Sequence, residues 1–353
     1  MKHRILVVDD SVVSRRMLSD ALAASTDLEL AGLAANGKIA LAKLDQAKPD
    51  LVILDVEMPE LDGLGTLREL RIRHPKLPVI MYSSLTRRGA ATTMEALSAG
   101  ANDYAAKPEI TDQRPAARQI QEDLLPKIRA LLGVRAPLAT SDLLPRTILP
   151  LATPTPVELV VIGASTGGPN ALAELIPMLP SDFPLPVVIV QHMPPVFTRL
   201  LAERLSSRTR LKVVEAIEPG PALPGHIYVA PGDHHLEVTR LQGRPYLLVN
   251  DGPPQNSCRP SVDVLFRSAA REFGSSVLAV VLTGMGKDGL LGAAALHQRG
   301  ARVIVQNEAS SVVWGMPGYV AEAGLAEVQL GPVELGKEIA SRVGNRAEGR
   351  RHA

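Results

Sequence analysis

The chain has 353 residues, more than one ordinary hydrophobic core requires and enough for two domains. Hydrophobic residues make up 46% of the sequence, as in globular domains, and the 38 Lys and Arg residues nearly balance the 37 Asp and Glu residues. This balance excludes a general electrostatic attraction to nucleic acid or to an anionic membrane, and no apolar stretch approaches the ~20 residues that span a bilayer.

The first ten residues lack the apolar stretch and the small-residue cleavage site of a signal peptide. Cys258 is the single cysteine, so the chain can form neither an internal disulfide nor a zinc site made of several thiolates. These features predict a cytoplasmic protein that neither inserts into membranes nor binds nucleic acid.

Short apolar runs alternate with amphipathic helical stretches in the first part of the chain, residues 1–132. Each run ends in polar or turn residues, and the runs cover residues 5–8, 51–54, 79–82 and 104–106. Short buried strands separated by helices predict an α/β domain with a parallel sheet and helices on both faces.

A second series of apolar runs follows a proline-rich stretch. Residues 133–156 contain prolines at a density that leaves too few amide donors for regular structure, so we expect a stiff linker there. The second series predicts another doubly wound, mostly parallel α/β domain over residues 157–345, with a frayed tail over 346–353. Its runs cover residues 159–162, 187–190, 227–229, 277–282 and 302–305.

Carboxylate, hydroxyl and ammonium side chains follow the predicted strands of the first domain. Asp9 and Asp10 end the first strand, and Asp55 ends the second apolar run. Because the carboxyl ends of parallel strands meet in one crevice, these carboxylates come together there, and a cation must offset their repulsion. Oxygen ligands of this kind suit Mg²⁺. Ser83 and Lys107 end later strands, so the sequence predicts a phosphoryl-transfer site with one Asp as the acceptor.

The alternative to this site gives the same residues unrelated structural roles. Asp9 and Asp10 would then be helix caps, and Lys107 would be a surface charge. Five such side chains at the ends of successive strands favour the phosphoryl-transfer site over this alternative.

The first 132 residues resemble a bacterial response-regulator receiver. The motifs are Asp9-Asp10, Leu-Asp-Val-Glu-Met-Pro around Asp55, Gly63, Ser83 and Lys107-Pro108. The resemblance implies a flavodoxin-like fold with a five-stranded parallel sheet, Asp55 as phosphoacceptor, and Ser83 and Lys107 as phosphoryl contacts. It also implies a Mg²⁺ ion held by Asp9, Asp10, Asp55 and the backbone of Glu57. Tyr104 matches the family's switch aromatic and is equally well explained as a packed tyrosine.

A serine follows the first strand of the second domain, in the sequence Gly-Ala-Ser-Thr-Gly-Gly-Pro. Pro169 suits the first position of a helix, so Ser165 would lie beside free amides at the positive end of that helix. Gly163, Ser165 and Gly167 match the spacing of a nucleophile elbow. A dinucleotide-binding turn is disfavoured because Ser165 replaces its second glycine and the next strand ends in Gln-His rather than in an acid. A tight turn with a capping serine is the remaining alternative.

Two further polar side chains favour a catalytic serine. His192 follows the strand at 187–190, and Asp288 lies just beyond the strand at 277–282. Ser165, His192 and Asp288 therefore end strands on one edge of one sheet, as a Ser-His-Asp triad requires. Their chain order differs from the Ser-Asp-His order of the common hydrolase fold, which indicates a different scaffold.

Other candidate residues are weaker. His234 and His235 are rival bases, but their strand is less apolar and no second carboxylate or thiolate cluster is evident beside them. Cys258 is a poor candidate nucleophile because the sequence shows no base near it.

Five motifs in residues 158–342 resemble the CheB-type protein-glutamate methylesterase family. They are Gly-Ala-Ser-Thr-Gly-Gly-Pro, Gln-His-Met-Pro, Pro-Ser-Val-Asp-Val-Leu-Phe, Leu-Thr-Gly-Met-Gly-Lys-Asp-Gly and Trp-Gly-Met-Pro. The resemblance implies hydrolysis of glutamate methyl esters, and deamidation of glutamines, on methyl-accepting chemotaxis receptors. Thr166 and Met285 would support the oxyanion hole, and the esterase itself would need no cofactor.

The same resemblance implies how the enzyme is regulated. A chemotaxis histidine kinase would be the phosphodonor, and the unphosphorylated receiver would block the Ser165 cleft until Asp55 is phosphorylated. The main alternative is a receiver-controlled binding module whose hydrolase domain is catalytically weak. A transcription regulator is disfavoured because the second half shows neither a basic patch nor a helix-turn-helix pattern.

Overall fold

A computed structural model describes residues 2–84, 86–108, 114–134 and 155–349. The chain divides into two compact units, Met1–Arg135 and Ala136–Ala353. Most of the predicted linker, residues 135–154, lies outside the described residues.

The first unit contains a five-stranded parallel sheet in the order β2-β1-β3-β4-β5, which confirms the predicted receiver fold. The four predicted strands are present. The additional strand β2 lies at the edge of the sheet and is only partly buried, so its sequence lacks a continuous apolar run. The strands are β1 (His3–Val8), β2 (Leu28–Ala34), β3 (Leu51–Asp55), β4 (Val79–Ser83) and β5 (Asp103–Ala106).

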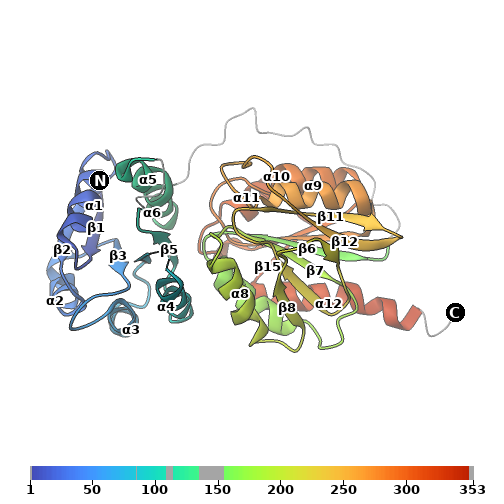
Figure 1. The fold of residues 1–353 in the computed structure, drawn as a ribbon, viewed down its shortest axis with the longest axis horizontal. Helices are drawn as coiled ribbons and strands as arrows, with labels where there is room; N and C mark the ends of the chain where they lie inside the picture. The colour runs from blue at the N-terminus through green and yellow to red at the C-terminus, as the bar shows by residue number, and fades with distance from the viewer. Residues whose placement is uncertain (1, 85, 109–113, 135–154, 350–353) are drawn as a thin grey trace. The chain divides into compact units, whose positions relative to one another are not determined.

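Helices cover both faces of this sheet (Figure 1). α1 (Val12–Ala23) shares a core with α5 (Ala116–Gln119), α6 (Leu125–Leu131) and the π-helical turn Ile120–Leu124 between them. On the other face lie α2 (Gly37–Ala47), α3 (Gly63–Arg73) and α4 (Arg87–Ser98). A polar N-cap residue directly precedes each of the helices α1 to α4, and its side chain accepts a hydrogen bond from an amide of the first turn. These N-cap residues are Ser11, Asn36, Asp62 and Thr86.

The second unit contains a seven-stranded parallel sheet in the order β15-β14-β13-β6-β7-β10-β8. The five predicted strands occupy its centre, and the unpredicted β8 and β15 lie at its two edges. The strands are β6 (Leu159–Ala164), β7 (Val187–Gln191), β8 (Lys212–Glu215), β10 (His226–Val229), β13 (Val277–Val281), β14 (Arg302–Gln306) and β15 (Val328–Leu330). Strands β6, β7 and β13 are buried along their whole length, as expected where helices cover both faces.

Helices also cover both faces of the second sheet (Figure 1). α9 (Val262–Phe273), α10 (Leu290–Gln298) and α11 (Met316–Glu322) lie on one face, and α7 (Gly168–Leu175), α8 (Phe197–Ser206) and α12 (Pro332–Gly349) lie on the other. α12 continues to Gly349, into the segment that we expected to be frayed. A small antiparallel sheet, which we did not predict, packs against α9 and consists of β9 (Gly220–Pro221), β11 (His235–Leu241) and β12 (Arg244–Asn250).

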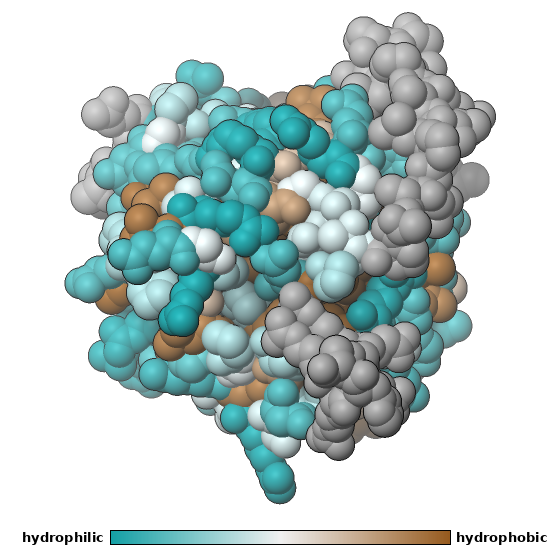
Figure 2. Space-filling view, turned by 90° about the vertical axis from the view of Figure 1, so that its right-hand side faces the viewer, coloured by the Kyte–Doolittle hydropathy of each residue, from teal (hydrophilic) through white to brown (hydrophobic). Residues whose placement is uncertain are grey.

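The surface of the molecule is mixed in character. Figure 2 shows one face on which hydrophilic residues dominate and apolar residues are scattered among them. Among the described residues, no helix is both long enough and apolar enough to cross a membrane.

Candidate active site

Three predicted site residues of the second unit lie at the carboxyl ends of its central strands. Ser165 follows β6, His192 follows β7, and Asp288 lies in the loop between β13 and α10. The strand β6 pairs with both β13 and β7, so these three strand ends are neighbours at one edge of the sheet. Strand order reverses between β6 and β13, and ligands of α/β proteins bind in the crevice formed at such a point.

The turn that carries Ser165 does not cap the following helix with a side chain. α7 begins at Gly168, one residue before Pro169, and its N-cap is Gly167, in the left-handed conformation at φ 80°. No side-chain hydrogen bond caps this helix, so the interpretation of Ser165 as a capping serine is wrong. Ser165 itself does not have a positive φ, which agrees with a scaffold other than the common hydrolase fold.

The predicted oxyanion residues lie in two loops that meet at Ser165. The Ser165 amide donates to the carbonyl oxygen of Thr283 at 3.1 Å, and the Thr283 hydroxyl donates to the carbonyl oxygen of Thr166 at 3.0 Å. Gly284 approaches so closely that a Cβ atom there would lie 2.8 Å from Ser165 Cβ. Thr166 is buried and Met285 is partly buried. The backbones of both loops therefore lie close to the serine.

His192 is paired with Asp288. The Nε2 atom of His192 lies 2.8 Å from Oδ2 of Asp288, and both side chains are largely buried. Because Nε2 is engaged by the carboxylate, Nδ1 is the ring nitrogen left to act as a base. No hydrogen bond joins Ser165 Oγ to His192 within the described part of the chain, and in a ligand-free site such bonds are often formed only with substrate.

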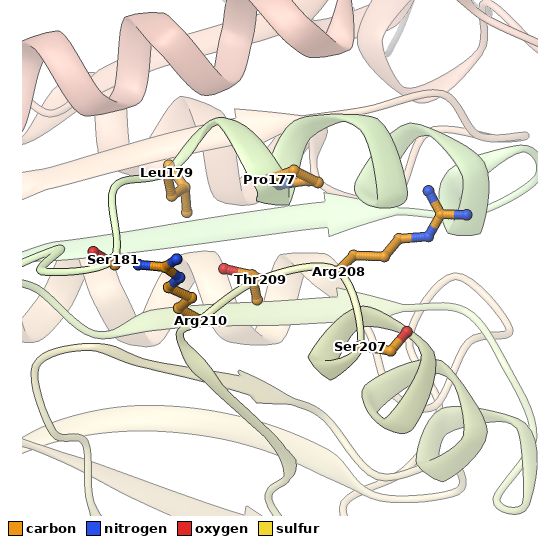
Figure 3. A pocket seen from close by; sticks show the side chains of 7 residues that line it. All are labelled: Pro177, Leu179, Ser181, Ser207, Arg208, Thr209 and Arg210. Atoms are coloured by element: carbon orange, nitrogen blue, oxygen red, sulfur yellow. The ribbon is translucent and has the colours of Figure 1, made fainter.

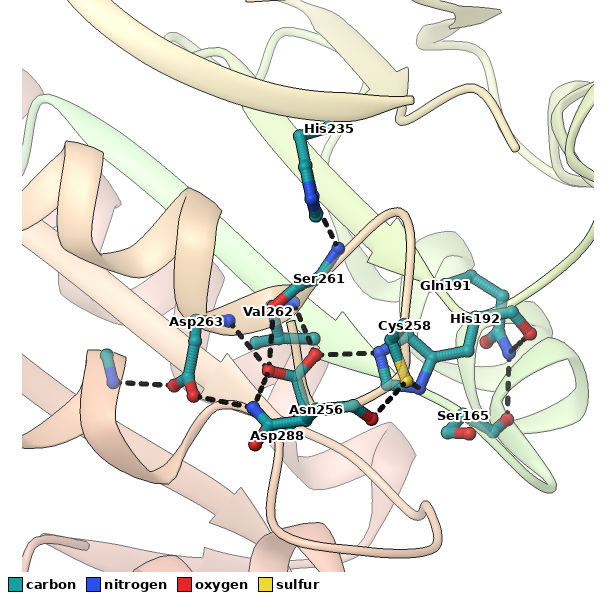
Figure 4. A network of polar contacts seen from close by, with 11 residues as sticks. Ser165, Gln191, His192, His235, Asn256, Cys258, Ser261, Val262, Asp263 and Asp288 are labelled. Atoms are coloured by element: carbon teal, nitrogen blue, oxygen red, sulfur yellow. Dashed lines mark hydrogen bonds and ion pairs between the residues drawn. The ribbon is translucent and has the colours of Figure 1, made fainter. Parts of the chain in front are cut away.

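The amino-terminal end of α9 holds Asp288 in place (Figure 4). Besides His192, four groups donate to its two carboxylate oxygens: Ser261 Oγ (2.8 Å), the Val262 amide (2.7 Å), the Asp263 amide (3.1 Å) and Asn256 Nδ2 (3.0 Å). Burial alone would raise the pKa of Asp288, but His192 and these donors outweigh it and lower the pKa to about 2. Asp288 is therefore ionised at neutral pH and orients the imidazole ring.

Gln191 is a site residue to which our sequence analysis gave no role. Its Nε2 donates to the carbonyl oxygen of Ser165 at 2.8 Å, and the residue is 2% exposed. The amide thus joins the end of β7 to the serine turn at the end of β6, as Figure 4 shows. Its place beside His192, in the motif Gln-His-Met-Pro, was the signal available in the sequence.

The phosphoryl-transfer residues of the first unit also come together. Lys107 Nζ lies 2.9 Å from Oδ2 of Asp9 and 2.8 Å from Oδ2 of Asp55. One carboxylate oxygen from each of Asp9, Asp10 and Asp55 lies within 4.8 Å of the other two. The N-cap of α1 is Ser11, so the alternative in which the two neighbouring carboxylates cap a helix and Lys107 is a surface charge is wrong.

This cluster is suited to Mg²⁺. Burial raises the pKa of Asp55 to about 6, although Lys107 acts in the opposite direction. The positive charge of Lys107 therefore does not fully offset the cost of burying the ionised carboxylate. A divalent cation among three carboxylates supplies the remaining compensation. The Glu57 amide donates to Asp55 at 3.4 Å, which places the backbone of Glu57 beside the cluster, and Ser83 is buried at the end of β4.

Tyr104 is packed inside the first unit. It is 5% exposed, and Lys127 Nζ lies 4.7 Å from the centre of its ring. This position agrees with the interpretation of Tyr104 as a packed tyrosine.

Comparison with known proteins gives the family. The CheB methylesterase model matches residues 160–339, and the response regulator receiver domain model matches residues 5–117. The chain belongs to the CheB methylesterase family. A relative from Trichodesmium erythraeum, named protein-glutamate methylesterase/protein-glutamine glutaminase, is 48% identical over 351 residues, 97% of this chain and 99% of the relative. A relative of the same name from Nocardioides sp. is also 48% identical, over 96% of this chain and 95% of the relative.

A solved structure of this family supports the fold of the second unit. The catalytic domain of the Thermotoga maritima CheB methylesterase is 42% identical and matches with a TM-score of 0.52. The match covers 53% of this chain and 99% of that domain. We therefore refer to the second unit as the methylesterase domain.

Cys258 lies against His192 in the methylesterase domain, so the structure places beside it a base that the sequence did not show. Its Sγ is 3.6 Å from His192 Nδ1, the ring nitrogen that does not face Asp288. Burial would lower the pKa of His192, but hydrogen bonds with Asp288 and Cys258 outweigh it and raise the pKa to about 10. His192 and Cys258 are 66 residues apart, so sequence spacing gave no sign of this contact.

The Cys258 contact predicts a shift in pH dependence. Because His192 must lose its proton to act as a base, we expect kcat/KM for ester hydrolysis to rise with pH through the pKa of His192. Cys258→Ala removes one group that raises this pKa, so the rise should occur about one pH unit lower, the shift expected from one hydrogen bond to a charged group. The measurement is kcat/KM against pH, with Ser257→Ala, in the same turn, as the control. A profile unchanged from wild type would contradict the prediction.

The two rival histidines have other roles. His235 is buried; its Nδ1 accepts from the Ser261 amide at 3.2 Å, and its Nε2 lies 3.1 Å from the carbonyl oxygen of Pro253. His234 pairs with the exposed Asp251. Neither histidine is hydrogen-bonded to Ser165 or Asp288 within the described residues, which agrees with their lower rank as bases.

A cavity of about 490 Å³ lies elsewhere on the methylesterase domain. Figure 3 shows its lining side chains, which come from the segments preceding β7 and β8 and from the end of α8: Pro177, Leu179, Ser181, Ser207, Arg208, Thr209 and Arg210. These segments lead into the amino ends of the strands, whereas Ser165 and His192 follow carboxyl ends. The cavity is therefore separate from the candidate active site.

Proposed function

We propose that this chain hydrolyses glutamate methyl esters, and deamidates particular glutamines, on methyl-accepting chemotaxis receptors in the cytoplasm. The relatives that bear this activity in their names match almost the whole chain. The observation that carries the proposal is the pairing of His192 with Asp288 at 2.8 Å, beside the strand end that bears Ser165. A histidine oriented by an ionised carboxylate next to a serine is the arrangement of acyl-transfer hydrolases.

In the proposed reaction Ser165 Oγ attacks the ester carbonyl while His192 Nδ1 takes its proton. His192 then donates this proton to the departing methoxide, so methanol leaves and an acyl-enzyme remains. Water, deprotonated by His192, attacks the acyl-enzyme; as the bond to Ser165 Oγ breaks, His192 returns this proton to Oγ and glutamate is released. Asp288 stabilises the imidazolium that forms in both steps. Amides of the Thr166 and Met285 loops stabilise the oxyanion, and one such donor is worth about 3 kcal/mol.

The first unit, residues 1–132, is proposed to regulate the methylesterase domain, residues 157–345. Asp55 accepts a phosphoryl group from a chemotaxis histidine kinase, and Ser83 and Lys107 contact the phosphoryl oxygens. Asp9, Asp10, Asp55 and the backbone of Glu57 would hold Mg²⁺, which would supply charge neutralisation for this transfer. Phosphorylation raises activity by shifting the population from an inactive to an active conformation. This shift requires the phosphoryl group to interact more favourably with the active conformation than with the inactive one.

The test measures volatile methanol released from receptor carrying tritium-labelled methyl esters. A small phosphodonor with Mg²⁺ should raise wild-type release by about 5- to 150-fold, the range typical of coupling between sites. Asp55→Asn should retain only the unstimulated rate, because an amide does not accept the phosphoryl group. Asp45→Asn, an exposed position on α2, is the matched control and should be stimulated as wild type is.

Two outcomes would contradict the proposal. Equal stimulation of Asp55→Asn and wild type would remove Asp55 as phosphoacceptor. Folded wild type that releases no methanol from its cognate receptor under any condition would instead support a receiver-controlled binding module.

A further inference from the structure

A turn in the methylesterase domain brings one side-chain amide against two buried carboxylates. Asn256 Nδ2 lies 3.0 Å from Oδ1 of Asp288 and 3.0 Å from Oδ2 of Asp263. Both carboxylates are almost fully buried, with Asp263 1% and Asp288 2% exposed. Figure 4 shows the amide of Asn256 between them. The two hydrogens of one amide group can thus be shared between two negative charges.

The two carboxylates repel one another. Burial, and next the charge of Asp288, raise the pKa of Asp263. The Gly292 amide donates to Asp263 at 2.7 Å, and Arg267 is the nearby cation that favours its ionised form. Within the described residues, the amide of Asn256 is the one side-chain donor that contacts both carboxylates. Without it, no side-chain donor would offset the repulsion between both carboxylates, and the Asp288 carboxylate would be held less firmly beside His192.

The backbone around Asn256 is built to hold this amide in place. Gln255 and Cys258 exchange two backbone hydrogen bonds, at 3.0 and 2.8 Å, across a two-residue turn. Asn256 and Ser257 have φ values of 51° and 60°, the left-handed region that asparagine and glycine tolerate best. Among the described residues, the Ser257 side chain has no hydrogen-bond partner, so only Asn256 extends from this turn to the carboxylates.

We infer that Asn256 is a positioning residue of the esterase, which keeps the Asp288 carboxylate oriented toward His192 by bridging it to Asp263. The inference rests on the proposed role of Asp288 in the triad. It assigns Asp263 a role as well: its charge repels Asp288, and the amide of Asn256 offsets this repulsion by donating to both. Among the described residues no hydrogen bond joins Asn256 to Ser165, and its effect on catalysis is transmitted through Asp288 and His192.

The test uses the full chain, saturated with phosphodonor and Mg²⁺ so that the receiver state is the same for every variant. Asn256→Gly keeps the left-handed backbone and removes the amide, and Asn256→Asp keeps the shape and removes the donors. Asn256→Gly should lower kcat for methanol release about tenfold with KM unchanged, as expected for the loss of a hydrogen bond to a charged group. Asn256→Asp should lower kcat at least as much, because it also places a third carboxylate beside the other two. Ser257→Gly, in the same turn and with a similar φ, is the matched control and should retain wild-type kcat.

A double-mutant cycle distinguishes bridging from a merely structural turn. In an Asp263→Asn background one charge is gone and the new amide can itself face Asp288, so Asn256→Gly should cost about twofold or less rather than tenfold. Equal losses in the two backgrounds, a loss in Ser257→Gly as large as in Asn256→Gly, or no loss in either Asn256 variant would overturn the inference. Full activity in Ser165→Ala would instead overturn the proposed function, so the two failures are distinguishable.

Discussion

Ser165→Ala is expected to lower kcat for methanol release about a million-fold, the loss found when the nucleophile of a serine hydrolase triad is removed. The reason is that the acyl-enzyme cannot form, and His192 and Asp288 then have no hydroxyl to activate. The fold should be preserved, because the contacts of this turn use the backbone of Ser165: its amide donates to Thr283 and its carbonyl accepts from Gln191 and Gly168. KM should change little, since the removed oxygen atom forms no hydrogen bond within the described part of the chain.

The measurement is a time course at enzyme concentrations comparable with the receptor, so that slow residual turnover is visible above spontaneous ester hydrolysis. Ser181→Ala is the matched control and should be fully active, because Ser181 lines the cavity near the amino ends of the strands, away from the carboxyl ends that bear Ser165 and His192. A loss of tenfold or less in Ser165→Ala would contradict the assignment. Cys258, which contacts His192, would then become the candidate nucleophile, and a Ser165→Ala/Cys258→Ala double variant would be the next comparison.

The central strands and the positions of the three proposed triad residues were accessible from the sequence because both depend on local patterns. Each central strand is a short apolar run. In a parallel sheet the residue that follows such a run lies at the carboxyl edge, whatever the order of the strands. Ser165, His192 and Asp288 could therefore be placed at one edge without knowledge of strand order.

Edge elements were not accessible in this way. The strands β2, β8 and β15 are partly exposed, so their sequences lack continuous apolar runs. β11 and β12 mix polar with apolar residues, and β9 has two residues, too few for any pattern. Hydrogen bonding to a neighbour, which sequence periodicity does not record, defines these strands.

The supporting groups of the site were missed for a different reason. Asn256 and Cys258 reach Asp288 and His192 through contacts separated by 32 and 66 residues in the chain. Nothing in the spacing of a polar turn predicts which distant carboxylate or ring it will meet. Ser261 was partly accessible, because a serine directly before an apolar helical run indicates an N-cap. In the structure that serine donates to Asp288 instead.

Asp288→Asn is expected to lower kcat about ten-thousand-fold, the loss caused by the same substitution in a serine protease triad. The neutral amide cannot stabilise an imidazolium, and the surroundings fix how it must orient. Ser261, Asp263 and Asn256 all donate to Oδ1 of Asp288, whereas Oδ2 faces His192 and accepts only from the Val262 amide. The new side chain therefore meets fewer unfavourable contacts when its oxygen takes the place of Oδ1. Its NH₂ group then faces His192 Nε2, and the histidine proton moves to Nδ1. The base toward Ser165 is lost.

The same geometry predicts a loss of stability. One donor of the Asp288 cluster is left facing an NH₂ group, which costs about 1–3 kcal/mol for a buried unsatisfied group, so the thermal midpoint of the methylesterase domain should also fall. Asp251→Asn is the matched control, because Asp251 pairs with His234 at the surface, and it should retain both activity and midpoint. Activity within tenfold of wild type, together with a lowered midpoint, would show that Asp288 only anchors the start of α9. Such a result would show that the pairing of Asp288 with His192 does not contribute to catalysis.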